Sequence, residues 1–334
     1  MAKFFCAEAS RQANEDIIGS GTPYATYVLI ECPMPWAFEA MDSAAVPQNL
    51  RDLEQAVRQA KLSVRFLLIA PQQRKQTPQT KLIIYQQEHQ PFVGGYRRSE
   101  WDVDQIEQVA DIVKRYLAGE VNLTSSLQDN IQDILVCTHG MHDQCCAKYG
   151  LPFYRQALAT VSELKLDSSV RVWKTSHFGG HRFAPTAIVL PDGRYYGALN
   201  PSSLRVILTR TGDIQTLRSV YRGWGILPTP LQVLERELML KCGWDWFNYK
   251  LSHTILQQSE KQDWMQVELS VEQPDGTIYT YRAELTPDQK QTLCLKGSCN
   301  ASNASKFVKY RIDQLHLRTV LRPEEFVKPI RLSA

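Results

Sequence analysis

The chain has 334 residues, of which 43% are hydrophobic and 22% are charged, with a formal net charge of +3. This composition excludes a disordered chain and allows two or three domains of the usual roughly 100–200 residues. The small net charge, without a dense run of Lys and Arg, argues against nucleic acid as a partner, and no apolar run approaches the ~18 residues of a membrane span.

Residues 1–125 have the pattern of an α/β unit. Apolar, β-branched runs predict buried strands at 24–31, 64–70 and 81–86, with a helix at 48–62 between the first two. A stiff loop, Cys32-Pro33-Met34-Pro35-Trp36, follows the first strand because each proline restricts its own backbone and that of the residue before it. Apolar residues at helical spacing predict an amphipathic helix at 103–117, and the polar residues 119–130 are typical of a linker.

Residues 126–229 repeat this order. The predicted elements are a strand at 131–136, a helix at 146–164, a strand at 170–175, a hairpin of 186–190 with 194–198, and a helix at 201–209. The hairpin turns at Pro191-Asp192-Gly193, a strong turn sequence. The shared order of strand, helix, strand, hairpin and helix predicts two tandem α/β units of thioredoxin-like build.

Residues 230–334 differ from both units. The pattern predicts helix over 230–256, a hairpin of 264–273 with 277–285, and further strands at 291–296 and 306–315. We expect a small α+β extension without a catalytic pattern. Cys294 and Cys299 in this region are interpreted as incidental thiols, because their spacing alone indicates little.

Candidate metal ligands concentrate between Cys137 and His181. This stretch holds three of the eight cysteines and four of the seven histidines. Cys137 ends one predicted strand, Cys146 lies where a predicted helix begins, and His177 and His181 flank Phe178-Gly179-Gly180 after another strand. Two thiolates and two imidazoles offered from two strand-end loops suit a metal centre near a domain surface.

The residues alone leave three interpretations of this stretch open. A tetrahedral zinc site satisfies the ligand count, although Cys137 and Cys146 lie further apart than the cysteines of common structural zinc motifs. A thiol catalyst would use Cys145 or Cys146 at a helix N-terminus, where the thiol pKa is lowered. A [2Fe–2S] cluster held by Cys137, Cys146, His177 and His181 ranks level with zinc on spacing, because both centres accept nitrogen and sulfur ligands.

Three longer motifs carry a family resemblance. The sequence C-T-H-G-x-x-D-x-C-C-A lies at 137–147, S-H-x-G-G-H-R-F-A-P at 176–185, and L-P-D-G-x-x-Y-G at 190–197. Together with the loop E-C-P-M-P-W they closely resemble the sucrase/ferredoxin-like family over about residues 20–225. The resemblance implies thioredoxin-like ferredoxin domains and a [2Fe–2S] cluster bound by two Cys and two His. The implied ligands are Cys137, Cys146, His177 and His181.

The resemblance favours an electron carrier with a Rieske-like, mixed-ligand [2Fe–2S] cluster on the second unit and a first unit without a cluster. No nicotinamide fingerprint and no substrate pocket is indicated, so we expect an electron carrier rather than an enzyme with its own substrate. A zinc-stabilised binding module and a thiol oxidoreductase remain the alternatives. His139, His142 and Cys145 are expected to lie beside the site without being ligands.

The expected partner is a redox protein of unknown identity. A mild excess of basic residues around the site favours an acidic partner, with Lys174 and Arg182 on a solvated rim. The first residues lack an apolar core long enough for a signal peptide, and the cysteine density is far below that of a disulfide scaffold. We therefore expect a cytoplasmic protein with reduced thiols.

Overall fold

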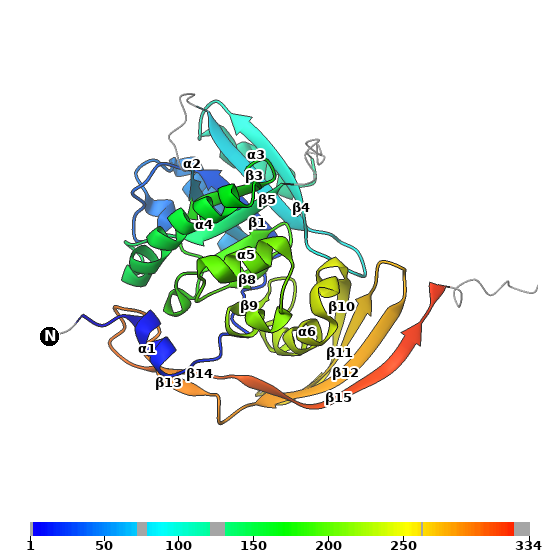
Figure 1. Ribbon diagram of the computed structural model, residues 1–334. Helices are drawn as coiled ribbons and strands as arrows, with labels where there is room; N and C mark the ends of the chain where they lie inside the picture. The colour runs from blue at the N-terminus through cyan, green and yellow to red at the C-terminus, as the bar shows by residue number, and fades with distance from the viewer. Residues whose placement is uncertain (1–2, 72–78, 121–130, 262, 324–334) are drawn as a thin grey trace, which may run out of the picture.

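The computed structural model describes residues 3–71, 79–120, 131–261 and 263–323. Its centre is one nine-stranded mixed sheet with the strand order β4-β3-β1-β2-β6-β5-β7-β8-β9 (Figure 1). A second, four-stranded sheet curves along one side of the molecule, and a short two-stranded hairpin continues from it. The predicted α/β class is confirmed in this general form. No helix in the described ranges has the length and apolar character needed to cross a membrane.

The first block, which runs from β1 to α3 (residues 26–117), forms one end of the large sheet. β1 pairs in parallel with β2 and antiparallel with β3, which pairs antiparallel with β4. Because side chains alternate between the two faces of a strand, Leu29 and Ile30 of β1 enter two different hydrophobic cores. The elements are β1 (Thr26–Glu31), α2 (Gln48–Gln59), β2 (Val64–Ala70), β3 (Thr80–Gln87), β4 (Tyr96–Val103) and α3 (Gln108–Leu117).

The second block repeats this arrangement with the same strand orientations. β5 pairs in parallel with β6 and antiparallel with β7, which pairs antiparallel with β8. The strand β9 (Tyr221–Trp224) extends this end of the sheet. The elements are β5 (Gln132–Cys137), α4 (Leu151–Glu163), β6 (Val170–Thr175), β7 (Ala187–Leu190), β8 (Arg194–Tyr196) and α5 (Pro201–Thr209).

The two blocks meet in two ways: strands β2 and β6 pair at their edges, and side chains of both blocks pack into one core. At the edge, β2 pairs antiparallel with β6 at Ile69 and Ala70 only. Further along, the sheet curls, so that side chains of β1 and β3 reach the second block. Tyr27 Oη lies 2.7 Å from Tyr195 Oη, and the Tyr85 hydroxyl donates a hydrogen bond to the buried carboxylate of Asp133. A single core therefore lies between the two halves of the sheet.

The C-terminal region covers the far end of the large sheet. Helix α6 contacts β9 on one side and the curved sheet of order β10-β11-β12-β15 on the other (Figure 1). Alternate residues of β11 are buried, which gives this sheet one apolar face. The elements are α6 (Thr229–Cys242), β10 (Lys250–Gln258), β11 (Met265–Glu272), β12 (Ile278–Pro287), β13 (Leu293–Leu295), β14 (Ser305–Phe307) and β15 (Tyr310–Leu321).

Three differences from the sequence prediction stand out. Residues 250–256 form a strand rather than helix, because residues 250–255 pair with β11 and the pairing resumes after a bulge at Leu256. Residues 96–103 form β4, so the helix begins at Gln108 and not at Val103. A short helix, α1 (Cys6–Gln12), precedes the first strand. The predicted linker lies almost wholly outside the described residues.

Candidate metal centre

The candidate ligands come from the ends of β5 and β6 and the loops that follow. Cys137 is the last residue of β5, where it is 1% exposed. Cys146 opens the π-helical turn η2 (Cys146–Gly150) that leads into α4. His177 follows β6, and His181 opens the short 3₁₀ turn η3 (His181–Phe183). The parallel pairing of β5 with β6 brings both strand ends to the same edge of the sheet.

The thiols of Cys137 and Cys146 and the imidazole of His177 form one compact group. Each Sγ lies 3.7 Å from His177 Nδ1, and one ligand atom from each residue lies within 4.8 Å of the others. Gly150 allows this close packing, because a Cβ there would collide with the backbone carbonyl of Cys137. Three of the four predicted site residues therefore meet directly.

His181 lies beside His177, with 4.9 Å between the ring centroids. Its Nε2 lies 2.6 Å from the carbonyl oxygen of Gly297, so Nε2–H donates and Nδ1 is the unprotonated nitrogen. Nδ1 is buried and has no hydrogen-bond partner among the described residues. Metal-binding histidines commonly donate their second ring N–H to a carbonyl, so His181 has the hydrogen bonding of a ligand. It groups within 4.8 Å with His142 and His177 rather than with the sulfurs.

The two thiols ionise unequally. Burial opposes ionisation of Cys137, but the Cys146 thiol, the N–H groups of His139 and Phe178, and the charge of Arg222 outweigh it, so the Cys137 pKa is lowered. The hydrogen bond with Cys137 raises the pKa of Cys146, and burial raises it further. Cys137 is therefore the more acidic thiol of the pair, and metal binding would displace the thiol protons that remain.

The imidazoles are held neutral. Burial is the main cause of the lowered pKa of both His177 and His181, and the neighbouring ring of His142 adds to it. The N–H of Gly179 donates to Nε2 of His177 at 3.1 Å, which leaves the ring proton on Nδ1, facing the sulfurs. Nδ1 must lose this proton before it can bind a metal, so metal binding by His177 is linked to proton release.

Two further histidines surround the group. His139 contacts the carbonyl oxygen of Ala37 through Nε2 at 2.7 Å and accepts the backbone N–H of His177 through Nδ1 at 3.2 Å. The ring of His142 stacks on His177, with centroids 4.0 Å apart, and on Phe38, with centroids 4.9 Å apart. Phe38 is 52% exposed. His139 therefore positions the His177 loop, and His142 connects His177 to the surface.

A cavity of about 450 Å³ opens beside His177. The sequence indicated no pocket, because the cavity lies between the first block and the loops of the second block, which are distant in sequence. Its lining combines apolar, basic, acidic and imidazole side chains from both blocks. They include Tyr24, Phe38, Met41, Arg65, His142 and His177.

Arg222 is a site neighbour that the sequence analysis missed. It is 1% exposed and donates hydrogen bonds to the carbonyl oxygens of Gly179 at 3.2 Å and Ser20 at 2.6 Å. Gly180 has a φ of +80°, and a Cβ at that position would collide with the Arg222 guanidinium. The second glycine of the G-G pair was the available signal, since it marks a close approach to the backbone.

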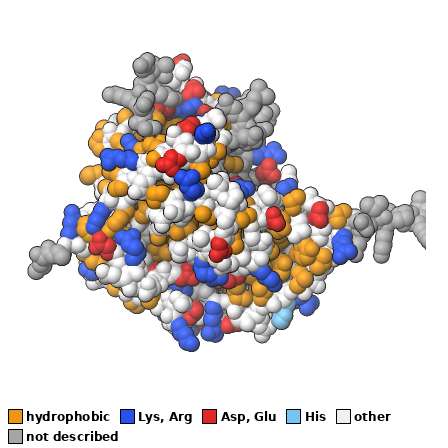
Figure 2. All heavy atoms as spheres, in the orientation of Figure 1, with side chains coloured by type: hydrophobic (Ala, Val, Ile, Leu, Met, Phe, Trp, Pro, Cys, Tyr) orange, Lys and Arg blue, Asp and Glu red, His pale blue; other side chains and the backbone are white. Residues whose placement is uncertain are grey.

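The prediction that Arg182 lies on a solvated basic rim is wrong. Its side chain is 15% exposed and pairs with Glu15 at 3.1 Å, so it belongs to a mostly buried ion pair rather than to a solvated surface. Lys174 lies with its Nζ 5.2 Å from the centroid of the Tyr154 ring. On the face drawn in Figure 2, basic and acidic side chains are interspersed.

A second group of soft ligands lies nearby. It brings Cys299, interpreted above as incidental, against Cys145 with 3.3 Å between the sulfurs, and that interpretation is therefore wrong for Cys299. Cys294 is exposed. The hydrogen bond from the Cys6 thiol is the main cause that lowers the Cys145 pKa to about 7. The group consists of Cys6, Asp143, Cys145 and Cys299.

Comparison with known proteins gives three results. The family model described as sucrase/ferredoxin-like matches residues 17–223. The "altered inheritance of mitochondria protein 32" of Meyerozyma guilliermondii is 29% identical over 111 residues, which are 30% of this chain and 39% of that protein. A solved thioredoxin-like [2Fe–2S] ferredoxin from Aquifex aeolicus is 15% identical, with a TM-score of 0.25 over 30% of this chain and 96% of the ferredoxin.

Proposed function

The chain belongs to the sucrase/ferredoxin-like family, and from that premise we propose that it is an electron carrier with a Rieske-like [2Fe–2S] cluster on its second block. The proposed ligands are Cys137, Cys146, His177 and His181. In the same proposal, residues 1–125 and 126–229 are two thioredoxin-like domains, the first without a cluster, and residues 230–334 are an α+β extension. The proposed location is the cytoplasm.

The observation that carries this proposal is the donor set itself. Two buried sulfurs lie around Nδ1 of His177, and the buried Nδ1 of His181 is unprotonated and has no partner in the described part of the chain. Burying a polar nitrogen without a partner is costly, which favours a ligand role for it. Sulfur and imidazole donors together suit zinc or iron–sulfur centres, and the family relationship favours iron–sulfur.

A bound [2Fe–2S] cluster would supply reversible one-electron transfer. Two thiolates and two neutral imidazoles carry half the negative charge of four thiolates, so they favour a higher reduction potential. Mixed-ligand sites of this type lie at roughly −150 to +300 mV, against about −400 mV for plant-type all-Cys clusters.

The stacked rings of His177, His142 and Phe38 provide a short route from the donor set to the surface. Phe38 reaches solvent at the border of the 450 Å³ cavity. We infer that the redox partner docks over this cavity, where its own centre would come close to the exposed end of the stack. Surface charge favours no strongly acidic partner, because Arg182 is not available on the rim.

Anaerobic purification with iron, sulfide and zinc counted per chain tests the proposal. We expect two iron and two sulfide per chain and a red-brown protein whose visible absorbance bleaches with dithionite. A colourless protein whose zinc is lost in the Cys137→Ala variant would instead identify a zinc-stabilised binding module. Thiol-dependent activity that survives His177→Ala but not Cys146→Ala would identify a thiol oxidoreductase.

A further inference from the structure

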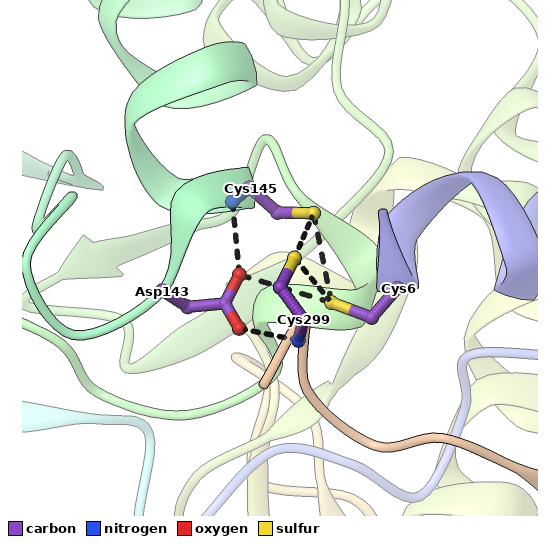
Figure 3. Close-up of side chains that lie close together, drawn as sticks. All are labelled: Cys6, Asp143, Cys145 and Cys299. Atoms are coloured by element: carbon purple, nitrogen blue, oxygen red, sulfur yellow. Dashed lines mark hydrogen bonds between the residues drawn. The ribbon is translucent and has the colours of Figure 1, made fainter. Parts of the chain in front are cut away.

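Three parts of the chain meet at a second cluster of sulfurs. Cys6 comes from α1, Asp143 and Cys145 precede the π-helical turn η2, and Cys299 lies in the loop between β13 and β14 (Figure 3). The Cys145 sulfur lies 3.5 Å from Cys6 and 3.3 Å from Cys299, and the third pair is 3.7 Å apart. The three thiols therefore form a nearly equilateral triangle.

This triangle has the dimensions of a metal site. Zinc–sulfur bonds of ~2.3 Å in a tetrahedral site place the sulfurs roughly 3.8 Å apart. A disulfide requires about 2.05 Å between two sulfurs and would leave the third thiol without a role. The surrounding hydrophobic cluster is small and separate from the main cores, with Ala7 and Ala184 as its other buried members. Apolar packing therefore gives little reason to gather three cysteines here.

Asp143 supplies the fourth donor. Its side chain is fully buried beside the thiols. Oδ1 accepts the N–H of Cys145 at 2.8 Å and lies 3.8 Å from the Cys6 sulfur, and Oδ2 accepts the N–H of Cys299 at 2.9 Å. A carboxylate has about four lone-pair sites, so each oxygen retains one for a metal. The Cys145 sulfur also faces the backbone N–H of Ala7 at 3.5 Å.

We propose that Cys6, Cys145, Cys299 and Asp143 bind one zinc ion, at a site distinct from the Cys137–Cys146 group. Zinc binding displaces the protons of the three thiols and requires no redox change. The adjacent residues Cys145 and Cys146 then serve two different centres, because their side chains leave the turn in different directions. This proposal does not depend on the nature of the centre at Cys137.

The proposed zinc has one consequence that rests on the proposed function. The ion would fasten the loop of Cys299 and the helix of Cys6 to the second block. Gly297 of the same loop accepts the Nε2–H of His181, and this bond fixes which ring nitrogen is free to bind a metal. The zinc is therefore expected to hold a candidate cluster ligand in its binding form.

Metal analysis of matched cysteine variants tests the site. The full chain is produced in zinc-supplemented medium and purified anaerobically, and zinc, iron and sulfide are counted per chain. We expect one zinc in the wild type and a loss of at least tenfold in Cys6→Ser and Cys299→Ser. The control Cys294→Ser, which alters an exposed thiol of the same hairpin region, should retain its zinc. Cys137→Ala should also retain it.

A protection experiment on the wild-type protein covers variants that fail to fold. Under native conditions, an alkylating reagent should modify Cys294 but spare Cys6, Cys145 and Cys299 until a zinc chelator is added. Equal zinc in the wild type and Cys299→Ser, or a disulfide mass in the anaerobic protein, would overturn the proposal. Loss of all zinc in Cys137→Ala would also overturn it. A protein that contains zinc but no iron would contradict the proposed cluster and leave the zinc site standing. A protein that contains iron but no zinc would contradict the zinc site and leave the cluster standing.

Discussion

The first and second blocks share their strand order, yet in the described part of the chain the candidate donor group of Cys137, Cys146 and His177 lies wholly in the second. Cys32 directly follows β1 and Cys137 ends β5, and each thiol is 1% exposed. Burial raises the pKa of Cys32 to about 11. At Cys137 the neighbouring thiol, two backbone N–H groups and Arg222 outweigh burial, and the pKa is lowered. The donors around a cysteine at a strand end, rather than its position, therefore decide whether its thiol pKa is raised or lowered.

The first block instead holds the loops of the second. Arg65 donates to the carbonyl of His177 at 2.7 Å. The backbone N–H of Ser176 donates to the carbonyl oxygen of Leu68 at 2.8 Å. The Ser176 hydroxyl accepts the backbone N–H of Leu68 at 3.0 Å. The Ala37 carbonyl contacts His139. The first block thus helps to determine where the candidate ligands of the second block lie.

The largest expected effect separates the two cysteines. Cys137→Ala should reduce iron and sulfide at least tenfold, because only three of the four proposed donors remain. Cys32→Ala removes an equally buried thiol from the first block and should leave both counts unchanged. Metal analysis and visible spectra of the two variants provide the measurement. Equal iron in both would show that the two blocks do not differ as proposed.

The next effect concerns the reduction potential. His177→Cys should keep a cluster but lower its potential by on the order of 100 mV or more, because a thiolate replaces a neutral imidazole. His89→Cys alters an exposed histidine of the first block and should leave the potential within error. Both values are measured by redox titration of the visible bands. An unchanged potential in His177→Cys would remove His177 from the donor set.

The smallest effect concerns the ion network between the blocks. Burial opposes ionisation of Glu100, but Arg171 of the second block, with Lys81 and Arg98, lowers its pKa from 4.5 to about 2. Since the folded pKa is depressed, its stabilisation is complete above pH ~4.5 and lost as the pH falls toward 2; it amounts to about 3 kcal/mol.

Glu100→Gln should therefore lower the unfolding midpoint by roughly 5 °C at pH 7, and this difference should shrink below pH ~4. Glu54→Gln, which alters the 4.0 Å surface pair with Arg58, should change little at any pH. Thermal unfolding of both variants across the pH range is the measurement. A difference that persists at pH 3 would contradict the role of the ionised Glu100.

The block architecture was largely predictable, because apolar runs and turn residues mark strands locally. β1, β2 and the hairpin of β7 with β8 were predicted nearly to their ends. β4 was not predicted, because charged residues fill it, and the partners of Glu100 include Arg171, which is distant in the sequence. Residues 250–256 were misassigned because their pairing with β11 is not visible in local pattern.

The predicted ligands all belong to the sequence motifs and lie close together in the structure. The site neighbours that were not predicted lie outside those motifs. Cys137, Cys146 and His177 form one group, with His181 beside His177. Tertiary packing brings Arg222 to Gly179 and Cys299 to Asp143, although both residues lie far along the sequence from the His177 loop. Spacing rules describe ligands on one or two loops, so they could not reveal a group assembled from both ends of the chain.

The antiparallel junction of β2 with β6 has a consequence for truncated forms. Two residues of each strand pair there, so the junction closes a short part of the edge between the two half-sheets. Bare strand edges are templates for intermolecular pairing and aggregation. A fragment limited to residues 126–229 would uncover β6, free the His177 loop from Arg65, and tend to self-associate. The portion that carries the candidate ligands is consequently expected to depend on the first block for its own structure.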